Sequence, residues 1–312
     1  MKNQTTRRGF VKASLLSGAG LALASLSPDG WAAQPFNRAG KPRLLLSLAA
    51  YSFRDYFKDA KHKRDKETDP TKRIDLFQFI DYCAAQGCVG AELTSYYFPG
   101  DLNEEFLLRL KRHAFLRGVE VSGTAVGNNF TLPKGEKRTA EIAHVKKWID
   151  YAQILGAPHI RVFAGNAGSQ SVAEAQANCI EALTECCDYA GKKGIFLGVE
   201  NHGGIVAEPE GLLRIIKAVE SPWLGINLDT GNFRTEDPYA DLAKIAPYAV
   251  NVQYKAEITP KGKAAEPSDT KRVMDILRDA NYQGYVALEY ESAEDPYTAI
   301  PGILKGMKAQ MG

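Results

Sequence analysis

The chain has 312 residues, of which 45% are hydrophobic and 24% are charged, and its formal net charge at pH 7 is +2. This length suffices for one large domain with a well-buried core, and a nearly balanced charge without a basic patch argues against a nucleic-acid partner. The five cysteines are an odd number without a paired CxxC spacing, which argues against a disulfide scaffold or a zinc ribbon.

The first 33 residues predict an export signal. Arg7 and Arg8 open a twin-arginine pattern, which is followed by a moderately apolar stretch over residues 13–26. That stretch is too short for a stable membrane span, and its serines and glycines make it too weakly hydrophobic. We therefore expect residues 1–33 to be removed on export by the twin-arginine route, and residues 34–312 to form a periplasmic or otherwise exported protein. A disordered basic tail is the alternative interpretation.

Downstream of this signal, strand-like and helix-like segments alternate without a break. Strands are expected at residues 43–53, 89–94, 119–124, 159–164, 195–201, 224–229, 249–255 and 285–291. Helices are expected at residues 71–86, 103–117, 137–155, 172–193, 209–220, 238–246, 268–281 and 296–310. Acidic residues before Pro238 and Pro296 mark helix starts, and Gly156 and Gly194 mark helix ends.

Eight strands alternating with eight helices predict one α/β domain, a (β/α)8 TIM barrel. In the seventh predicted strand, Val250, Val252 and Tyr254 share one face, while Asn251, Gln253 and Lys255 share the other. The apolar face suits the surrounding helices, so the polar face is expected to point into the barrel. The alternative fold, a doubly wound open sheet, typically has a glycine-rich phosphate-binding turn after its first strand. Residues 49–53 contain no glycine, which argues against this alternative.

Four polar residues close successive strands in the second half of the chain: Glu200, Asp229, Gln253 and Glu289. In a parallel barrel these strand ends converge, and three negative charges cannot share a pocket without a cation or protons to neutralise them. The oxygen-rich set therefore predicts a divalent metal site. The alternative is that each carboxylate caps the next helix or pairs with a nearby lysine or arginine.

These strand ends also resemble the sugar phosphate isomerase/epimerase superfamily, the xylose-isomerase-like barrels. The segments that carry the resemblance are Gly-Val-Glu-Asn-His at 198–202, Asn-Leu-Asp-Thr-Gly-Asn at 227–232, Asn-Val-Gln-Tyr-Lys at 251–255 and Ala-Leu-Glu-Tyr at 287–290. Their order fits the superfamily from Leu44 through Glu289, essentially the whole mature chain. The group includes ketose 3-epimerases, inosose dehydratases and hydroxypyruvate isomerases.

The resemblance implies a metal held by one residue from each of the last four strands. Its ligands would be Glu200, Asp229, Gln253 and Glu289, at positions where the family has Glu, Asp, His and Glu. Gln253 is a departure, because an amide oxygen replaces the only nitrogen ligand. A wholly oxygen shell favours Mn²⁺ or Mg²⁺ over Zn²⁺.

The same resemblance implies a reaction at the carbon next to a sugar carbonyl. In the ketose 3-epimerases, two metal-bound glutamates take and return the proton, which here means Glu200 and Glu289. The expected function is therefore a metal-dependent isomerase or epimerase working through an enediolate. A lyase or dehydratase acting on keto-sugars or 3-keto-glycosides is the first alternative, which export favours. A non-catalytic sugar-binding barrel is the second.

Five further residues are expected to contact a small carbohydrate substrate. Strand parity selects His202, Lys255, Glu92 and Arg161, while the resemblance selects Asn232, where the 3-epimerases place a histidine. Each has a simpler interpretation: His202 can be a hydrogen-bonded loop residue, Lys255 can neutralise the carboxylates, and Glu92 and Arg161 can pair with each other. A homo-oligomer is compatible with the sequence.

Overall fold

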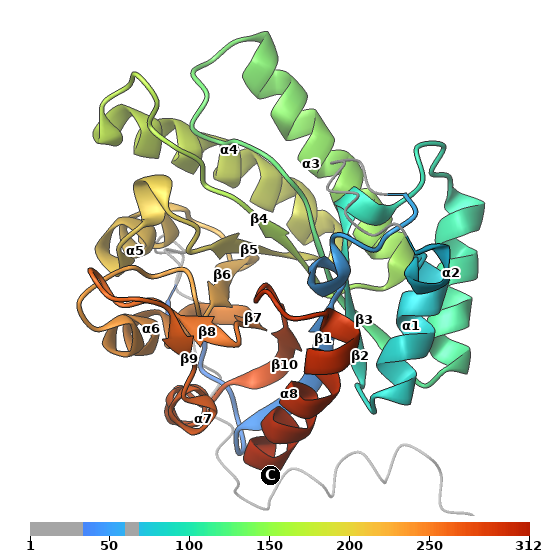
Figure 1. The fold of residues 1–312 in the computed structure, drawn as a ribbon. Helices are drawn as coiled ribbons and strands as arrows, with labels where there is room; N and C mark the ends of the chain where they lie inside the picture. Colours follow the sequence, from blue (N-terminus) through green and yellow to red (C-terminus); the bar gives the residue numbers. More distant parts are fainter. Residues whose placement is uncertain (1–33, 60–68) are drawn as a thin grey trace, which may run out of the picture. The chain divides into compact units, whose positions relative to one another are not determined.

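A computed structural model describes residues 34–59 and 69–312. The predicted export signal, residues 1–33, lies outside the described residues. Within the described part, eight parallel strands close into a barrel in the order β1-β10-β7-β6-β5-β4-β3-β2, with helices outside it (Figure 1). This arrangement confirms the predicted single-domain (β/α)8 barrel.

The observed elements follow the expected order closely. The barrel strands are β1 (Arg43–Ala49), β2 (Gly90–Thr94), β3 (Glu120–Ala125), β4 (His159–Val162), β5 (Phe196–Glu200), β6 (Leu224–Asp229), β7 (Ala249–Tyr254) and β10 (Gln283–Leu288). The helices are α1 (Leu76–Ala85), α2 (Glu104–Leu116), α3 (Glu136–Leu155), α4 (Val172–Lys193), α5 (Pro209–Ala218), α6 (Pro238–Ile245), α7 (Thr270–Asp279) and α8 (Pro296–Met311). A small antiparallel pair, β8 (Glu257–Ile258) and β9 (Glu266–Pro267), follows β7.

Helix ends are set by side-chain caps and by glycines, and the predicted ends at Gly156 and Gly194 are confirmed. Asp75 and Ser171 form capping boxes at the starts of α1 and α4, which satisfy free backbone N–H groups there. Gly156 and Gly194 end α3 and α4 with φ angles of 80° and 71°, which glycine adopts without strain. In the part of the chain that the structure describes, no helix is both long and apolar enough to cross a membrane.

The first strand is shorter than expected, and this matters for the mouth of the barrel. β1 ends at Ala49, and residues Ala50–Phe53 form a 3-10 helix rather than continued strand. The Ser52 hydroxyl donates to the Leu288 carbonyl oxygen at 3.0 Å and accepts from the Tyr290 N–H at 2.9 Å. These two bonds fix the turn after β1 against the end of β10.

The prediction that Val250 lies on the outer face of β7 is wrong. The register between β6 and β7 shifts at Asn227, so β7 carries one extra residue, Val250. A Cβ atom on Gly225 would lie 2.4 Å from one Val250 methyl, and a Cβ on Gly198 would lie 3.1 Å from the other. Val250 therefore packs inside the barrel, against two positions without side chains, instead of sharing the outer face with Val252. A β-bulge of this kind disrupts simple alternation along a strand.

All five cysteines lie in the described part of the chain, and all are buried with free thiols. Their positions in and after α1 and in α4 fit the expectation of small buried hydrophobic side chains.

Candidate active site

A cavity of about 430 Å³ opens at the carboxyl-terminal end of the barrel, the end at which enzymes of this architecture place their chemistry. Its lining residues are Tyr51, Arg54, Tyr96, Tyr97, Arg161, Phe163, Glu200, His202, Lys255, Glu289 and Glu291. They come from loops and strand ends that lie far apart in the sequence, brought together by closure of the barrel.

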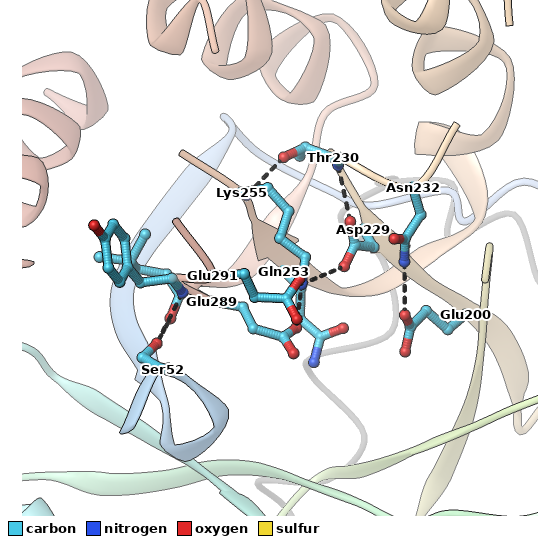
Figure 2. A network of polar contacts seen from close by, with 12 residues as sticks. Ser52, Glu200, Asp229, Thr230, Asn232, Gln253, Lys255, Glu289 and Glu291 are labelled. Carbon is cyan, nitrogen blue, oxygen red and sulfur yellow. Dashed lines mark hydrogen bonds and ion pairs between the residues drawn. The ribbon is translucent and has the colours of Figure 1, made fainter. Parts of the chain in front are cut away.

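A carboxylate cluster surrounds the amine of Lys255 on one side of this cavity. We use that name for Glu200, Asp229, Glu289 and Glu291. Lys255 Nζ lies 3.4 Å from Asp229 Oδ2, 3.5 Å from Glu289 Oε2 and 2.5 Å from Glu291 Oε2. Figure 2 shows the lysine extended between these carboxylates. Burial alone lowers the pKa of Lys255, but the three carboxylates outweigh it, and the net shift is upward, so the amine stays charged.

Asp229 is held rigidly from both its backbone and its side chain. Its N–H donates to Asn201 Oδ1 at 2.8 Å, and its Oδ1 accepts from the Gly231 N–H at 2.8 Å. Burial raises the pKa of Asp229; Lys255 opposes this shift, and Glu200 and Glu289 add to it. The carboxyl is thus fixed in place with Oδ2 directed at the lysine.

Glu200, at the end of β5, is fixed by two different neighbours. Asn232 Nδ2 donates to its Oε1 at 2.8 Å, as Figure 2 also shows, and Arg161 Nε lies 3.0 Å from its Oε2. Burial raises the pKa of Glu200; Arg161 opposes the shift and Glu289 adds to it. A carboxylate whose pKa is raised in this way is a stronger base than a free glutamate.

A closed ring of hydrogen bonds lies inside the barrel, deeper than the carboxylate cluster. Gln253 Nε2 and Asn251 Nδ2 donate to the two oxygens of Glu92 at 2.6 and 2.7 Å. Asn227 Nδ2 donates to Gln253 Oε1 at 2.6 Å, and Asn227 Oδ1 accepts from Asn251 at 2.8 Å. We call these four residues the amide ring. Burial, with a contribution from Glu289, raises the pKa of Glu92 to about 7.

The structure divides the predicted site residues between these two layers. Glu200, Glu289, His202, Lys255 and Arg161 line the cavity. Asp229 lies behind them against Lys255, and Asn232 reaches the cavity through Glu200. Glu92 and Gln253 belong instead to the amide ring, so Glu92 does not pair with Arg161, which lies against Glu200.

The residues present do not fit the four-ligand metal site that the resemblance implies. Among the described residues, no group of three or more His, Cys, Asp or Glu side chains is arranged to hold a metal ion. Gln253 uses its amide oxygen and nitrogen within the amide ring, and both Glu200 oxygens face donors. Two expected ligands, Asp229 Oδ2 and Glu289 Oε2, are buried without a hydrogen-bond partner in the described structure, and both face Lys255.

Several cavity residues were not predicted from the sequence. The rings of Tyr51 and Tyr96 lie edge to face, 6.5 Å apart, and the Phe163 ring lies 4.6 Å from that of His202. Phe163 also carries the Arg161 guanidinium 3.9 Å above its centre. Together these rings give the cavity an aromatic surface, of the kind that packs against the apolar face of a ligand.

Two of the missed residues had a signal in the sequence. Glu291 is two residues past Glu289, and Phe163 is two past Arg161, so strand parity alone would have placed each of them beside its partner. Tyr51 had none, because it lies in the 3-10 turn that was expected to be strand.

Comparison with known proteins gives a family match over most of the chain. A family model described as xylose isomerase-like TIM barrel matches residues 80–309. A search of curated proteins found no match.

Several solved structures share the fold. An L-ribulose 3-epimerase is 14% identical, with a TM-score of 0.67 over 85% of this chain and 92% of that one. The 3-keto-D-glucoside 4-epimerase from E. coli is 15% identical, with a TM-score of 0.63 over 86% and 100%. The probable 3-DHS dehydratase of petrobactin synthesis from Bacillus anthracis is 16% identical, with a TM-score of 0.58 over 86% and 97%. At these identities the likeness is one of fold.

Proposed function

Because the chain belongs to the xylose isomerase-like TIM barrel family, we propose that it is a sugar isomerase or epimerase that moves a proton at the carbon next to a carbonyl group. One observation carries the proposal. Two buried carboxyl groups, Glu200 and Glu289, line the same cavity, together with the charged groups of Lys255 and Arg161. This is the set of groups that proton abstraction beside a carbonyl requires: a base, an acid and a positive charge.

Each group has a defined part in the proposed reaction. One glutamate takes the proton from the carbon next to the carbonyl, and Glu200 suits this step because burial raises its pKa. The negative charge that develops on the carbonyl oxygen is stabilised by the Lys255 ammonium group, which lies in the cavity wall. For epimerisation, Glu289 enters the reaction protonated and gives its proton to the opposite face of the same carbon, so that Glu200 ends protonated and Glu289 ionised. For isomerisation, Glu200 returns its own proton on the same face to the neighbouring carbon, while the hydroxyl proton passes to the former carbonyl oxygen.

The experiment that tests this proposal is NMR analysis of products in D₂O, on a panel of ketoses, aldoses and 3-keto-glucosides. The expected result is deuterium at a carbon next to the carbonyl, with inversion or with movement of the carbonyl. A folded protein that binds sugars of the panel but exchanges no proton would contradict the proposal and favour a sugar-binding barrel.

A lyase is the second candidate, and His202 favours it. His202 lines the cavity two residues after Glu200, where it can protonate a departing hydroxyl or glycoside oxygen. Loss of that group from the carbon next to the site of proton abstraction gives elimination. The same NMR experiment separates the two reactions, because elimination yields an unsaturated product. Replacement His202→Gln should lower elimination more than it lowers deuterium exchange.

We also propose that the protein works outside the cytoplasm, on the strength of the Arg7–Arg8 pattern. A fluorescent protein fused behind residues 1–40 should reach the periplasm of a host with the twin-arginine route. The matched control, with Arg7→Lys and Arg8→Lys together, should stay in the cytoplasm. Equal distribution of the two fusions would contradict export by this route.

A further inference from the structure

We infer that the Lys255 ammonium group takes the place of the divalent cation in this barrel, so that the site works without a resident metal ion. The inference stands on three contacts, which concern Lys255, Gln253 and Glu200 in turn.

Lys255 already supplies a cation to the two free carboxylate oxygens. Its amine lies 3.4 Å from Asp229 Oδ2 and 3.5 Å from Glu289 Oε2, the buried oxygens without a hydrogen-bond partner in the described structure. The lysine backbone is fixed as well, because its N–H donates to Thr230 Oγ1 at 2.8 Å. A metal ion bonded to both oxygens would stand against this amine, and two positive charges so close in a buried site repel strongly.

Gln253 is not available as a third ligand. Its amide oxygen accepts from Asn227, and its amide nitrogen donates to Glu92, each at 2.6 Å. When Glu92 is ionised it only accepts hydrogen bonds, so it faces the amide nitrogen of Gln253 rather than the amide oxygen. Turning Gln253 towards the mouth would leave buried groups of both partners without a hydrogen bond, which is costly in a site with little water.

Glu200 offers no free oxygen either. Asn232 donates to Oε1, and the Arg161 guanidinium lies against Oε2. Of the four expected ligands, therefore, two each have one free oxygen that faces Lys255, and the other two have their side chains held by other groups. Mg²⁺ requires near-ideal octahedral geometry, for which two carboxylate oxygens beside an ammonium group are a poor match.

The amine can supply the same chemistry as an electrophile. A lysine ammonium group carries three donors and a full positive charge, so one donor can bind the carbonyl oxygen of a substrate while the carboxylates hold the others. This role in the reaction rests on the proposed function. The exclusion of the metal does not, because it concerns the protein without substrate.

Metal binding by the protein itself is the test. The wild type is stripped with EDTA, and its melting temperature and its heat of binding are then measured with Mn²⁺ and with Mg²⁺. If the site had a Kd of about 10 µM, 1 mM Mn²⁺ would be roughly 100 times the Kd. Binding at that concentration would raise the Tm by roughly 5–8 °C. We expect a shift below about 1 °C for the wild type, since without binding there is no stabilisation. A shift of several degrees with a one-to-one binding heat would overturn the inference.

Two substitutions identify the groups responsible. Lys255→Met removes the amine, and Gln253→His supplies a nitrogen ligand in place of the amide. The double variant is expected to gain a Mn²⁺-dependent rise in Tm that the wild type lacks. The matched control is Lys261→Met, which removes an exposed lysine paired with Glu236 on the surface. If the folded double variant ignores Mn²⁺ as the wild type does, Lys255 and Gln253 are not what keeps the metal out, and the assignment fails.

These measurements are independent of turnover. A wild type that fails to exchange deuterium on any sugar removes the proposed function but leaves the metal result standing. A wild type that binds Mn²⁺ tightly removes the inference but leaves the proposed function standing. If a variant does not fold, the wild-type titration alone decides.

Discussion

Two layers of polar side chains lie one above the other in this barrel, and they are held in opposite ways. In the amide ring, every member has a hydrogen-bond partner in the ring, and Asn251 Oδ1 is its one atom without one in the described structure. In the carboxylate cluster above it, Asp229 Oδ2 and Glu289 Oε2 lack such partners and are held by charge alone.

This difference suggests that the amide ring serves mainly to stabilise the fold, whereas the carboxylate cluster is the layer that we propose acts on substrate. A closed set of buried hydrogen bonds fixes the fold, because breaking any of them leaves a buried group unsatisfied. Unsatisfied oxygens beside a fixed cation cost stability, and such strain is typical of groups that await a substrate. Gln253 thus belongs to the hydrogen-bonded amide ring, and Glu289 belongs to the carboxylate cluster, which is the layer that we propose reacts. The sequence presents both residues as polar ends of adjacent barrel strands.

The largest expected effect comes from Glu289→Gln in the cluster. Loss of this carboxyl group removes the acid that returns the proton to the substrate, so turnover should fall by about 10²–10⁴-fold. The fold should persist, because Lys255 keeps Asp229 and Glu291 as partners. Initial rates on the identified substrate and a thermal melt measure the two effects.

The matched control for that change is Glu294→Gln, on the same loop. Glu294 is exposed and does not line the cavity, so its substitution should leave both turnover and Tm nearly unchanged. Wild-type rates for Glu289→Gln would remove it from the acid/base pair and would break the division between layers.

The second effect concerns the cation of the cluster. Lys255→Met should lower the free energy of unfolding by about 3–5 kcal/mol at pH 8, since it leaves buried carboxylates without their counter-charge. Because burial raises the pKa of Asp229, this carboxyl is protonated more readily than usual, and the loss should shrink as the pH falls. Urea titrations at pH 8 and pH 5.5 measure this. An equal loss at both values would mean that the effect comes from packing rather than from charge.

The third effect tests the amide ring. Gln253→Leu should lower the free energy of unfolding by about 2–4 kcal/mol, because Glu92 and Asn227 each lose a partner in a buried site. Turnover of the folded protein should stay within several-fold of wild type. If stability stayed intact and turnover were abolished, Gln253 would instead take part in the reaction, and its predicted role as a metal ligand would be supported.

The sequence predicted the fold well because the fold rests on local patterns. Helix caps and C-terminal glycines, such as those at Asp237 and Gly194, are visible in a few neighbouring residues, and α4 has the predicted bounds. Position along a strand also predicted that Glu200 and Glu289 would line a common cavity. The sequence did not predict that Val250 faces the inside of the barrel, because a β-bulge in β7 depends on how that strand pairs with β6.

The division into layers was beyond the sequence. Gln253 and Glu289 each end a mainly apolar strand segment, so they look alike in the sequence. They differ in the structure because Gln253 has a hydrogen-bond partner that is remote in the chain. Glu92 lies 161 residues from Gln253, and only closure of the barrel brings them within 2.6 Å. A strand pattern reports which way a side chain points, but not what it meets there.

The last expected effect concerns how the stability of the amide ring depends on pH. Burial raises the pKa of Glu92 to about 7 in the folded protein, above the value near 4.5 of an exposed glutamate. As the pH rises from 5 to 8, the unfolded chain gives up this proton more readily than the folded one, so Glu92 should cost about 2.5 kcal/mol of stability over that range. Glu92→Gln removes this term, so the stability difference between wild type and variant should change by that amount, measured by urea titration across the range. A difference independent of pH would show that the ring holds Glu92 with an ordinary pKa, in which case the hydrogen bonds from Asn251 and Gln253 outweigh its burial.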